Sequence, residues 1–196
     1  MRKSILTLFL LLSYSCVESI SAEEAFQSPY AGQETRAIKS LSSSDIDALE
    51  NGRGWGLAKA AELNGVPGPA HVLEMKEAIA LSTEQEQRIK ALFTDMQQQA
   101  IPLGRRLIEL EKVLNESFAK KTINKETLRQ QLDQITRTRA ELRYVHLVAH
   151  LETPTILSAQ QIEKYNNLRG YATNNPCDKV PTGHDPVMWR KHNNCE

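Results

Sequence analysis

The chain has 196 residues, of which 24 are Lys or Arg, 24 are Asp or Glu, and only 6% are aromatic. This length has room for one domain with terminal segments, and the zero net charge argues against a nucleic-acid-binding protein that relies on bulk positive charge. Because aromatic residues are few and runs of β-branched residues are absent, the composition favours an all-α fold.

Residues 1–22 have the features of a secretory signal peptide. Arg2 and Lys3 precede an apolar run from Ile5 to Leu12, and Ile20-Ser21-Ala22 offers small residues for cleavage. The apolar run is too short to cross a bilayer as a mature helix, so we expect a secreted chain without a transmembrane span. An alternative remains open in which Cys16 becomes a lipidated N-terminus, although the residues before it make a poor lipidation signal.

The next part of the chain predicts short elements separated by glycine and proline. Residues 23–40 are polar, and we expect them to be extended or mobile. Ser42–Asp45 offers N-caps for a short amphipathic helix. The glycine-rich stretch Asn51–Gly56 lacks the Lys-Ser/Thr ending and the preceding strand of a phosphate-binding loop. We therefore predict a flexible turn that leads into a helix over Leu57–Leu63, which Gly65 ends.

A rigid corner, Pro67-Gly68-Pro69, comes next in the sequence. Proline is favoured at the first position of a helix, so Pro69 predicts the start of another short helix. That helix carries His71, Val72, Met75 and Ile79.

The longest predicted elements are two helices between Leu81 and about Leu151, joined by a short turn at Lys120–Asn124. Steps of three and four separate the apolar residues of the first helix, which are Ile89, Phe93, Met96, Ala100, Leu103, Leu107, Leu110 and Leu114. The same steps continue in the second helix at Leu128, Leu132, Ile135, Arg139, Leu142, His146 and Ala149. The short turn predicts antiparallel neighbours. Pro102 should bend the first helix without breaking it, because the spacing continues through it.

One five-residue word, Leu-Ser-x-x-Gln, occurs twice. It begins the first long helix at Leu81, Ser82 and Gln85, and it begins a last helix at Leu157, Ser158 and Gln161. The word predicts a capping box, in which the serine hydroxyl accepts from the backbone N–H three residues on and the glutamine reaches back to the serine N–H.

The two leucines of these words are expected to pack differently. Leu157 can pack on Ile162 as a hydrophobic staple, whereas the equivalent residue in the first word is Glu86, so Leu81 must pack elsewhere. Pro154 should end the second long helix, and Gly170 the last one.

Residues 172–196 are rich in Asn, Pro and Gly and predict a disordered or loop-rich tail. In an oxidising compartment Cys177 and Cys195 most simply form one disulfide, which would close this tail. A soft-metal site that adds His184, Met188 and His192 is the alternative, but the spacing fits no standard zinc pattern.

Three histidines are candidate metal ligands. His146 and His150 lie four residues apart, on one face of a predicted helix, and His71 on a short helix would supply a third ligand for Zn²⁺, Cu²⁺ or Ni²⁺. The alternative is structural, with His146 satisfied within the helix pair and His150 on the surface. The sequence has no nucleophile elbow and no recognisable pair of catalytic carboxylates, so we expect no enzyme.

The leader, the helical hairpin and the two Leu-Ser-x-x-Gln words together resemble the LTxxQ periplasmic stress proteins, the group of Spy-like and CpxP-like chaperones and their metal-resistance relatives. The resemblance covers roughly residues 28–171, a span that includes Ala61–Gly65, Pro67-Gly68-Pro69 and His146 with His150. It implies a curved four-helix domain over residues 41–171, which is usually a dimer.

The resemblance also implies function: a periplasmic protein without ATP or active site that holds unfolded clients or modulates an envelope-stress sensor kinase. For the metal-linked members it implies binding of ions through histidines. This chain departs from the pattern, because serine replaces threonine in both words and the net charge is zero where some members are strongly basic. A histidine-rich terminal tail is also absent.

Overall fold

A computed structural model describes residues 26, 28–171, 176–177 and 180–195. The chain divides into two compact units, Met1–Thr35 and Arg36–Glu196. In the first unit the described residues form turns and the short 3₁₀ helix η2 (Gln33–Thr35). The predicted leader and Cys16 lie outside the described residues.

The second unit is all-α throughout its described residues, as the composition predicts. Its elements are α1 (Ser43–Glu50), α2 (Lys59–Glu62), α3 (Pro69–Glu74), α4 (Thr83–Ala119), α5 (Lys125–Glu152), η3 (Thr153–Thr155), α6 (Ala159–Arg169) and α7 (Pro186–His192). Among the described residues, no helix combines the length and the apolar composition needed to span a membrane.

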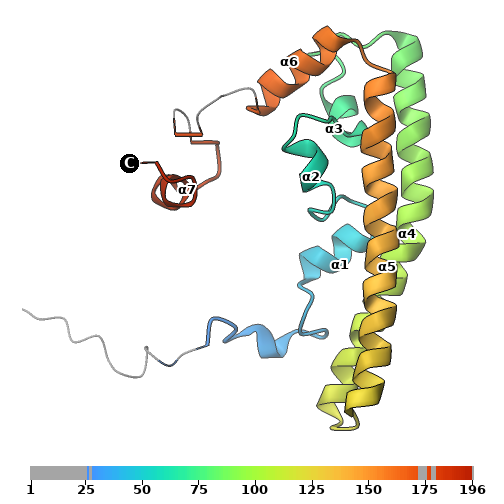
Figure 1. Cartoon of the computed structure of the whole chain (residues 1–196), viewed down its shortest axis with the longest axis vertical. Coiled ribbons are helices and arrows are strands. Elements are labelled where there is room, and N and C mark those ends of the chain that lie inside the picture. The colour runs from blue at the N-terminus through green and yellow to red at the C-terminus, as the bar shows by residue number, and fades with distance from the viewer. Residues whose placement is uncertain (1–25, 27, 172–175, 178–179, 196) are drawn as a thin grey trace, which may run out of the picture. The chain divides into compact units, whose positions relative to one another are not determined.

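Helices α4 and α5 form the predicted long hairpin, and they lie side by side in Figure 1. α4 continues through Pro102 without a break. The apolar spacing identified the packed face correctly, because that face supplies the buried residues Ile89, Met96, Ala100, Leu107, Leu110, Ile135, Leu142 and Ala149.

The two polar residues that interrupt the spacing on α5 have different surroundings. Arg139 is exposed, and its guanidinium lies 4.8 Å from the centroid of the Trp55 ring. His146 is buried in the helix pair and only 3% exposed. The first interruption is therefore explained by a cation–π contact with the loop that follows α1.

Capping boxes begin the helices where the sequence predicts caps. The two Leu-Ser-x-x-Gln words form them at Ser82 with Gln85 and at Ser158 with Gln161, and Ser42 with Asp45 forms another at α1. Gly170 ends α6 in the left-handed conformation, with a φ of 78°. Each of these caps satisfies backbone groups that a bare helix end leaves unpaired.

The core of the second unit consists of two hydrophobic clusters. One joins α1 and the loop after it to the middle of the hairpin, and it includes Leu49, Leu57 and Leu107. The other lies where α3, α4 and α6 meet, around Val72, Ile79, Ile89 and Tyr165. Leu81 packs against this second cluster, as does Leu157. This cluster includes residues from outside the first capping box, which agrees with the expectation that Leu81 does not pack on Glu86.

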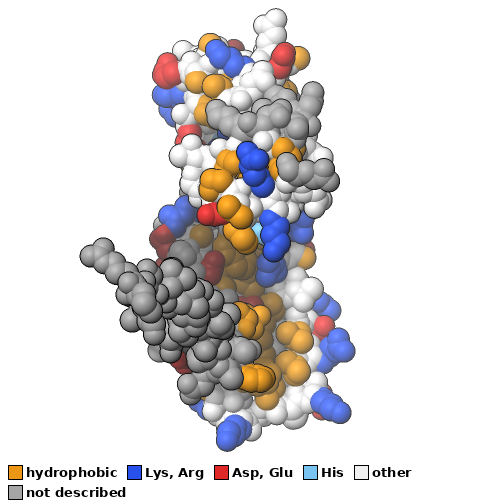
Figure 2. Space-filling model, turned by 90° about the vertical axis from the view of Figure 1, so that its left-hand side faces the viewer, with side chains coloured by type: hydrophobic (Ala, Val, Ile, Leu, Met, Phe, Trp, Pro, Cys, Tyr) orange, Lys and Arg blue, Asp and Glu red, His pale blue; other side chains and the backbone are white. Residues whose placement is uncertain are grey.

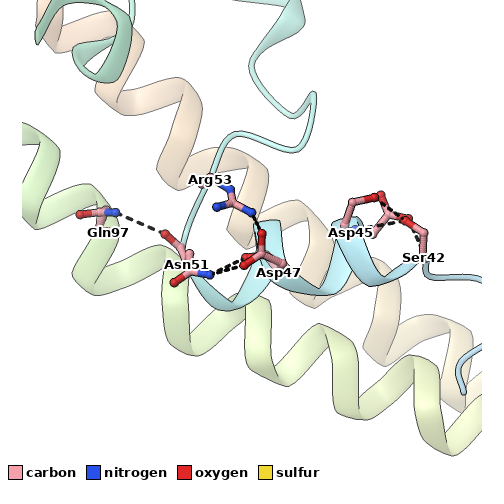
Figure 3. A network of polar contacts seen from close by, with 7 residues as sticks. Ser42, Asp45, Asp47, Asn51, Arg53 and Gln97 are labelled. Atoms are coloured by element: carbon pink, nitrogen blue, oxygen red, sulfur yellow. Dashed lines mark hydrogen bonds and ion pairs between the residues drawn. The ribbon is translucent and has the colours of Figure 1, made fainter. Parts of the chain in front are cut away.

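Helix α1 crosses α4 at a glycine. A Cβ placed on Gly104 would lie 2.2 Å from the backbone oxygen of Leu49, so only glycine permits this approach. Figure 3 shows how both ends of α1 are held: Ser42 and Asp45 cap the first turn, and Arg53 pairs with Asp47 near the last. These contacts fix the loop that follows α1.

Four segments differ from the sequence-based expectations. The helix that begins at Pro69 ends at Glu74, so Met75 and Ile79 lie in the turns that follow it. Within residues 23–40, expected to be extended or mobile, Ile38 packs in the core with 5% exposure, and Asn115 on α4 bonds to the backbone of Ala37 and Lys39. α2 is shorter than predicted because residues 55–58 form turns, which begin at Trp55 with a φ of 42°. The tail contains α7, which its composition did not predict, and Cys177 and Cys195 form the predicted disulfide.

Candidate functional site

A cavity of about 650 Å³ lies between the hairpin and the segment that contains α2 and α3. Its walls come from the loop after α1, from both short helices and from the facing sides of α4 and α5. All three histidines proposed as metal ligands line it, although they come from distant parts of the sequence. Other lining residues include Arg53, Trp55, Glu62, Gly68, Pro69, Ala70, Glu74, Phe93 and Met96.

The glycine-rich loop forms one wall of this cavity. Trp55 adopts its left-handed conformation between two glycines, and its indole Nε1 donates to Asp45 Oδ1 at 2.8 Å. Gln97 on α4 donates to the backbone oxygen of Asn51 at 3.3 Å (Figure 3). The hydrogen bonds that Asp45 accepts from Ser42 and Trp55 lower the pKa of that carboxyl. The loop expected to be a flexible turn is thus held at both ends.

Glu62 is the best-connected polar group of the site. Its Oε1 accepts from the Tyr165 hydroxyl at 2.8 Å and from the Tyr171 hydroxyl at 3.0 Å. The Arg169 guanidinium lies 3.0 Å from the same oxygen, and His71 Nδ1 lies 3.2 Å from it. One carboxylate at the end of α2 therefore holds both α6 and α3.

The charge state of Glu62 follows from these contacts. Burial alone would raise the pKa of the carboxyl, but the hydrogen bonds from His71 and Tyr165 outweigh it and lower the pKa to about 2. Burial and the hydrogen bond to Glu62 raise the pKa of Tyr165, which keeps its hydroxyl a donor. The cluster is an ionised carboxylate surrounded by donors.

His150 is a satisfied core histidine. Its Nδ1 lies 2.8 Å from the backbone oxygen of Val66. A Cβ placed on Gly68 would lie 2.4 Å from Nε2, so the glycine backbone packs directly against this edge of the ring. His150 is only 8% exposed, so the surface position considered in the structural alternative is wrong.

His146 is buried, but it is not satisfied. Its Nε2 has no hydrogen-bond partner among the described protein atoms. Burial, together with the neighbouring His150, lowers the pKa of His146 to about 4, so the ring is neutral at physiological pH. The polar atom that lacks a partner therefore belongs to a neutral imidazole in the cavity wall.

Among the described residues, no group of three His, Cys, Asp or Glu side chains is placed to hold an ion. In the tail, the disulfide uses both cysteines, and the His184 ring stacks edge-on to Trp189 with centroids 5.0 Å apart. The soft-metal alternative for the tail therefore lacks its two thiolate ligands in this structure.

Sequence reasoning found the histidines of the cavity but missed Glu62. Tyr165, on the last helix, is fully buried. Nothing in the sequence marks Glu62, because it follows two alanines in a short helix and its partners lie more than 100 residues away, apart from His71. Only the three-dimensional contact between α2 and α6 reveals this cluster.

Comparison with known proteins returned no matching family model, no matching curated protein and no matching solved structure.

Proposed function

We propose that this protein is a non-enzymatic periplasmic binding protein that holds unfolded polypeptide segments without ATP. The observation that carries this proposal is the uncovered end of the hairpin. From Glu111 to Gln134 no described residue is fully buried. Residues 37–40 bond to Glu111 and Asn115, and beyond these contacts the ends of α4 and α5 contact each other but are not enclosed. Hydrophobic side chains are exposed there, with 48% for Val113, 55% for Phe118 and 40% for Leu132.

The chemistry of this surface suits unfolded clients. On the face drawn in Figure 2, hydrophobic side chains are gathered in a hollow in the lower half of the picture, and Lys and Arg side chains lie beside it. Exposed apolar groups among charges of both signs favour weak and varied contacts with chains that expose their own apolar residues. The lysines and acidic residues between 111 and 134 include Lys112, Lys120, Lys121, Glu116, Glu126 and Asp133.

Aggregation of a chemically denatured client, diluted into buffer without nucleotide, tests this proposal. The mature oxidised protein should suppress light scattering at near-stoichiometric amounts, and Phe118→Gln with Leu132→Gln should weaken the effect. The matched control is Tyr144→Gln, because Tyr144 is 65% exposed on α5 outside the uncovered end. Equal suppression by all variants would contradict the assignment of the surface.

Two further roles depend on the same surface. A second copy of this chain covering the exposed apolar residues would give a homodimer, and a sensor kinase could use the surface as a docking site. Sedimentation of the wild type and of the Phe118/Leu132 variant tests the dimer. A dimer that dissociates in the variant supports this use of the surface, and one that persists contradicts it.

Divalent-metal binding is the second candidate function. It is supported by the single cavity that His71, His146 and His150 line. The contacts of His150 with Val66 and Gly68 occupy both edges of its ring, so His71 and His146 are the ligands that this geometry favours. Calorimetric titration with Zn²⁺, Cu²⁺ and Ni²⁺ should then show stoichiometric binding that is lost in His71→Ala/His146→Ala. Binding unaffected by this double change would exclude the site.

A further inference from the structure

Four apolar side chains that line the cavity suit a flat ring. Trp55 and Phe93 bring aromatic surface to it, Met96 brings a thioether, and Pro69 adds an apolar edge. Aromatic rings and methionine sulfur make favourable contacts with other rings. A volume of about 650 Å³ falls within the range of small-molecule sites.

The same cavity also has unused hydrogen-bonding capacity. His146 Nε2 is buried without a partner, and such atoms are rare because leaving them unpaired is costly. His71 Nδ1 points to the Glu62 carboxylate, so this nitrogen carries the proton and the opposite nitrogen remains to bond elsewhere. Both imidazoles line the cavity.

Two of the charged residues that line the cavity are paired within the protein: Glu62 with Arg169, and Arg53 with Asp47. The third, Glu74, is exposed to solvent, whereas His146 is buried and neutral. The buried part of the cavity at His146 therefore favours an uncharged molecule.

We propose that this cavity binds a small, uncharged, planar molecule with a hydrogen-bonding group on one edge, its ring against Trp55, Phe93 and Met96 and its polar edge at His146. This site is separate from the client-binding surface at residues 111–134, and it is an alternative to the divalent-metal site because both use His146. The residues that line the cavity determine the class of ligand. The aromatic and sulfur contacts favour a planar ring, and the unpartnered imidazole nitrogen of His146 favours a hydrogen-bonding group on its edge.

Calorimetric titration of the mature oxidised protein with defined probes tests this proposal. Phenol and benzamide are planar with a polar edge, toluene lacks the polar group, and cyclohexanol lacks the planar ring. With EDTA present to remove metals, phenol and benzamide should bind at one saturable site, about tenfold tighter than toluene or cyclohexanol, as expected for one hydrogen bond. Equal binding of all four probes, or no saturable binding, would overturn the proposal.

Variants locate the site. Ala70→Phe places a ring at a lining position and should abolish probe binding, whereas Ala60→Phe, on an exposed position of α2 away from the cavity lining, should not change it. His146→Phe keeps a ring but removes the nitrogen, so it should erase the preference for phenol over toluene. Thermal unfolding of each variant verifies folding. Probe binding that survives Ala70→Phe, or a preference that survives His146→Phe, contradicts the assignment.

Discussion

Gln85 and Gln161 lie 76 residues apart, and each side-chain amide donates to the other's carbonyl oxygen at 2.9 Å. Each glutamine also closes its own capping box, because its Oε1 accepts from the backbone N–H of Ser82 or Ser158. The remaining amide hydrogens bond across as well, from Gln85 to the oxygen of Ile156 and from Gln161 to that of Ala80. The two words of the sequence therefore form a single junction between the start of α4 and the start of α6.

This junction predicts that the two glutamines act as a unit. Gln85→Ala and Gln161→Ala should each lower the free energy of unfolding by about 1–2 kcal/mol, since each loses a cap and cross-helix bonds. The double change should cost less than the sum, because removing either residue already breaks the shared bonds. Chemical denaturation of the four proteins in the cycle measures the coupling. Gln87→Ala and Gln160→Ala, at exposed positions nearby, are controls, and strict additivity would contradict the junction.

Replacing Glu62 should release α6 from α2. Glu62→Gln removes the charge that four side chains contact, and it leaves Arg169 without its carboxylate. We expect a loss of about 1–3 kcal/mol in unfolding free energy and faster amide exchange in α6. Glu74→Gln is the matched control, because Glu74 lines the same cavity but is exposed. Unchanged exchange in α6 would show that this carboxylate does not hold the helix.

Stability should fall as the solution is acidified, in two separate windows. The folded pKa of His146 is about 4 against 6.5 for a free histidine, so the unfolded chain takes up a proton first and stability decreases from about pH 6.5 down to pH 4. The folded pKa of Glu62 is about 2 against 4.5, so its contribution is present above pH 4.5 and is lost as the pH falls towards 2.

His146→Phe separates these windows. It should flatten the stability profile between pH 6.5 and 4 and leave the lower window in place, and urea denaturation across this pH range measures both. A variant profile that keeps the slope of the wild type between pH 6.5 and 4 would assign the upper window to another group.

Two glycines should be intolerant of a side chain. Gly104→Ala brings a methyl group onto the Leu49 backbone, and Gly68→Ala brings one onto the His150 ring, so each should cost about 1–3 kcal/mol. Gly54→Ala is the control, because a Cβ there meets nothing within 4 Å. Thermal unfolding gives the comparison, and similar melting temperatures for all three variants would show that the backbone relaxes freely at these contacts.

The long elements were predictable because local rules determine them. Apolar residues at steps of three and four mark one face of a helix, as Ile89 and Leu107 do on α4 and Leu142 does on α5. The serine-glutamine words specify caps within four residues. The end of the last helix at Gly170 follows from the same local chemistry. These predictions required no knowledge of how the helices pack.

The candidate site was less predictable because it depends on distant contacts. His71, His146 and His150 were recognised by residue type, but their shared cavity depends on the close packing of Gly68 against His150. The role of Glu62 arises only when α6 returns to α2. The shortened α2 reflects the left-handed turn at Trp55, which glycine on both sides permits and which no periodicity indicates.

Amide hydrogen exchange, measured by mass spectrometry with and without a permanently unfolded client and without nucleotide, tests directly whether the hairpin end binds clients. The client should slow exchange in residues 111–134, where Val113, Phe118 and Leu132 are exposed, while exchange in α6 stays the same. Client binding at the uncovered end of the hairpin would be contradicted if only other parts of the protein were protected from exchange. It would also be contradicted if no part were protected at a client concentration at which the protein suppresses aggregation.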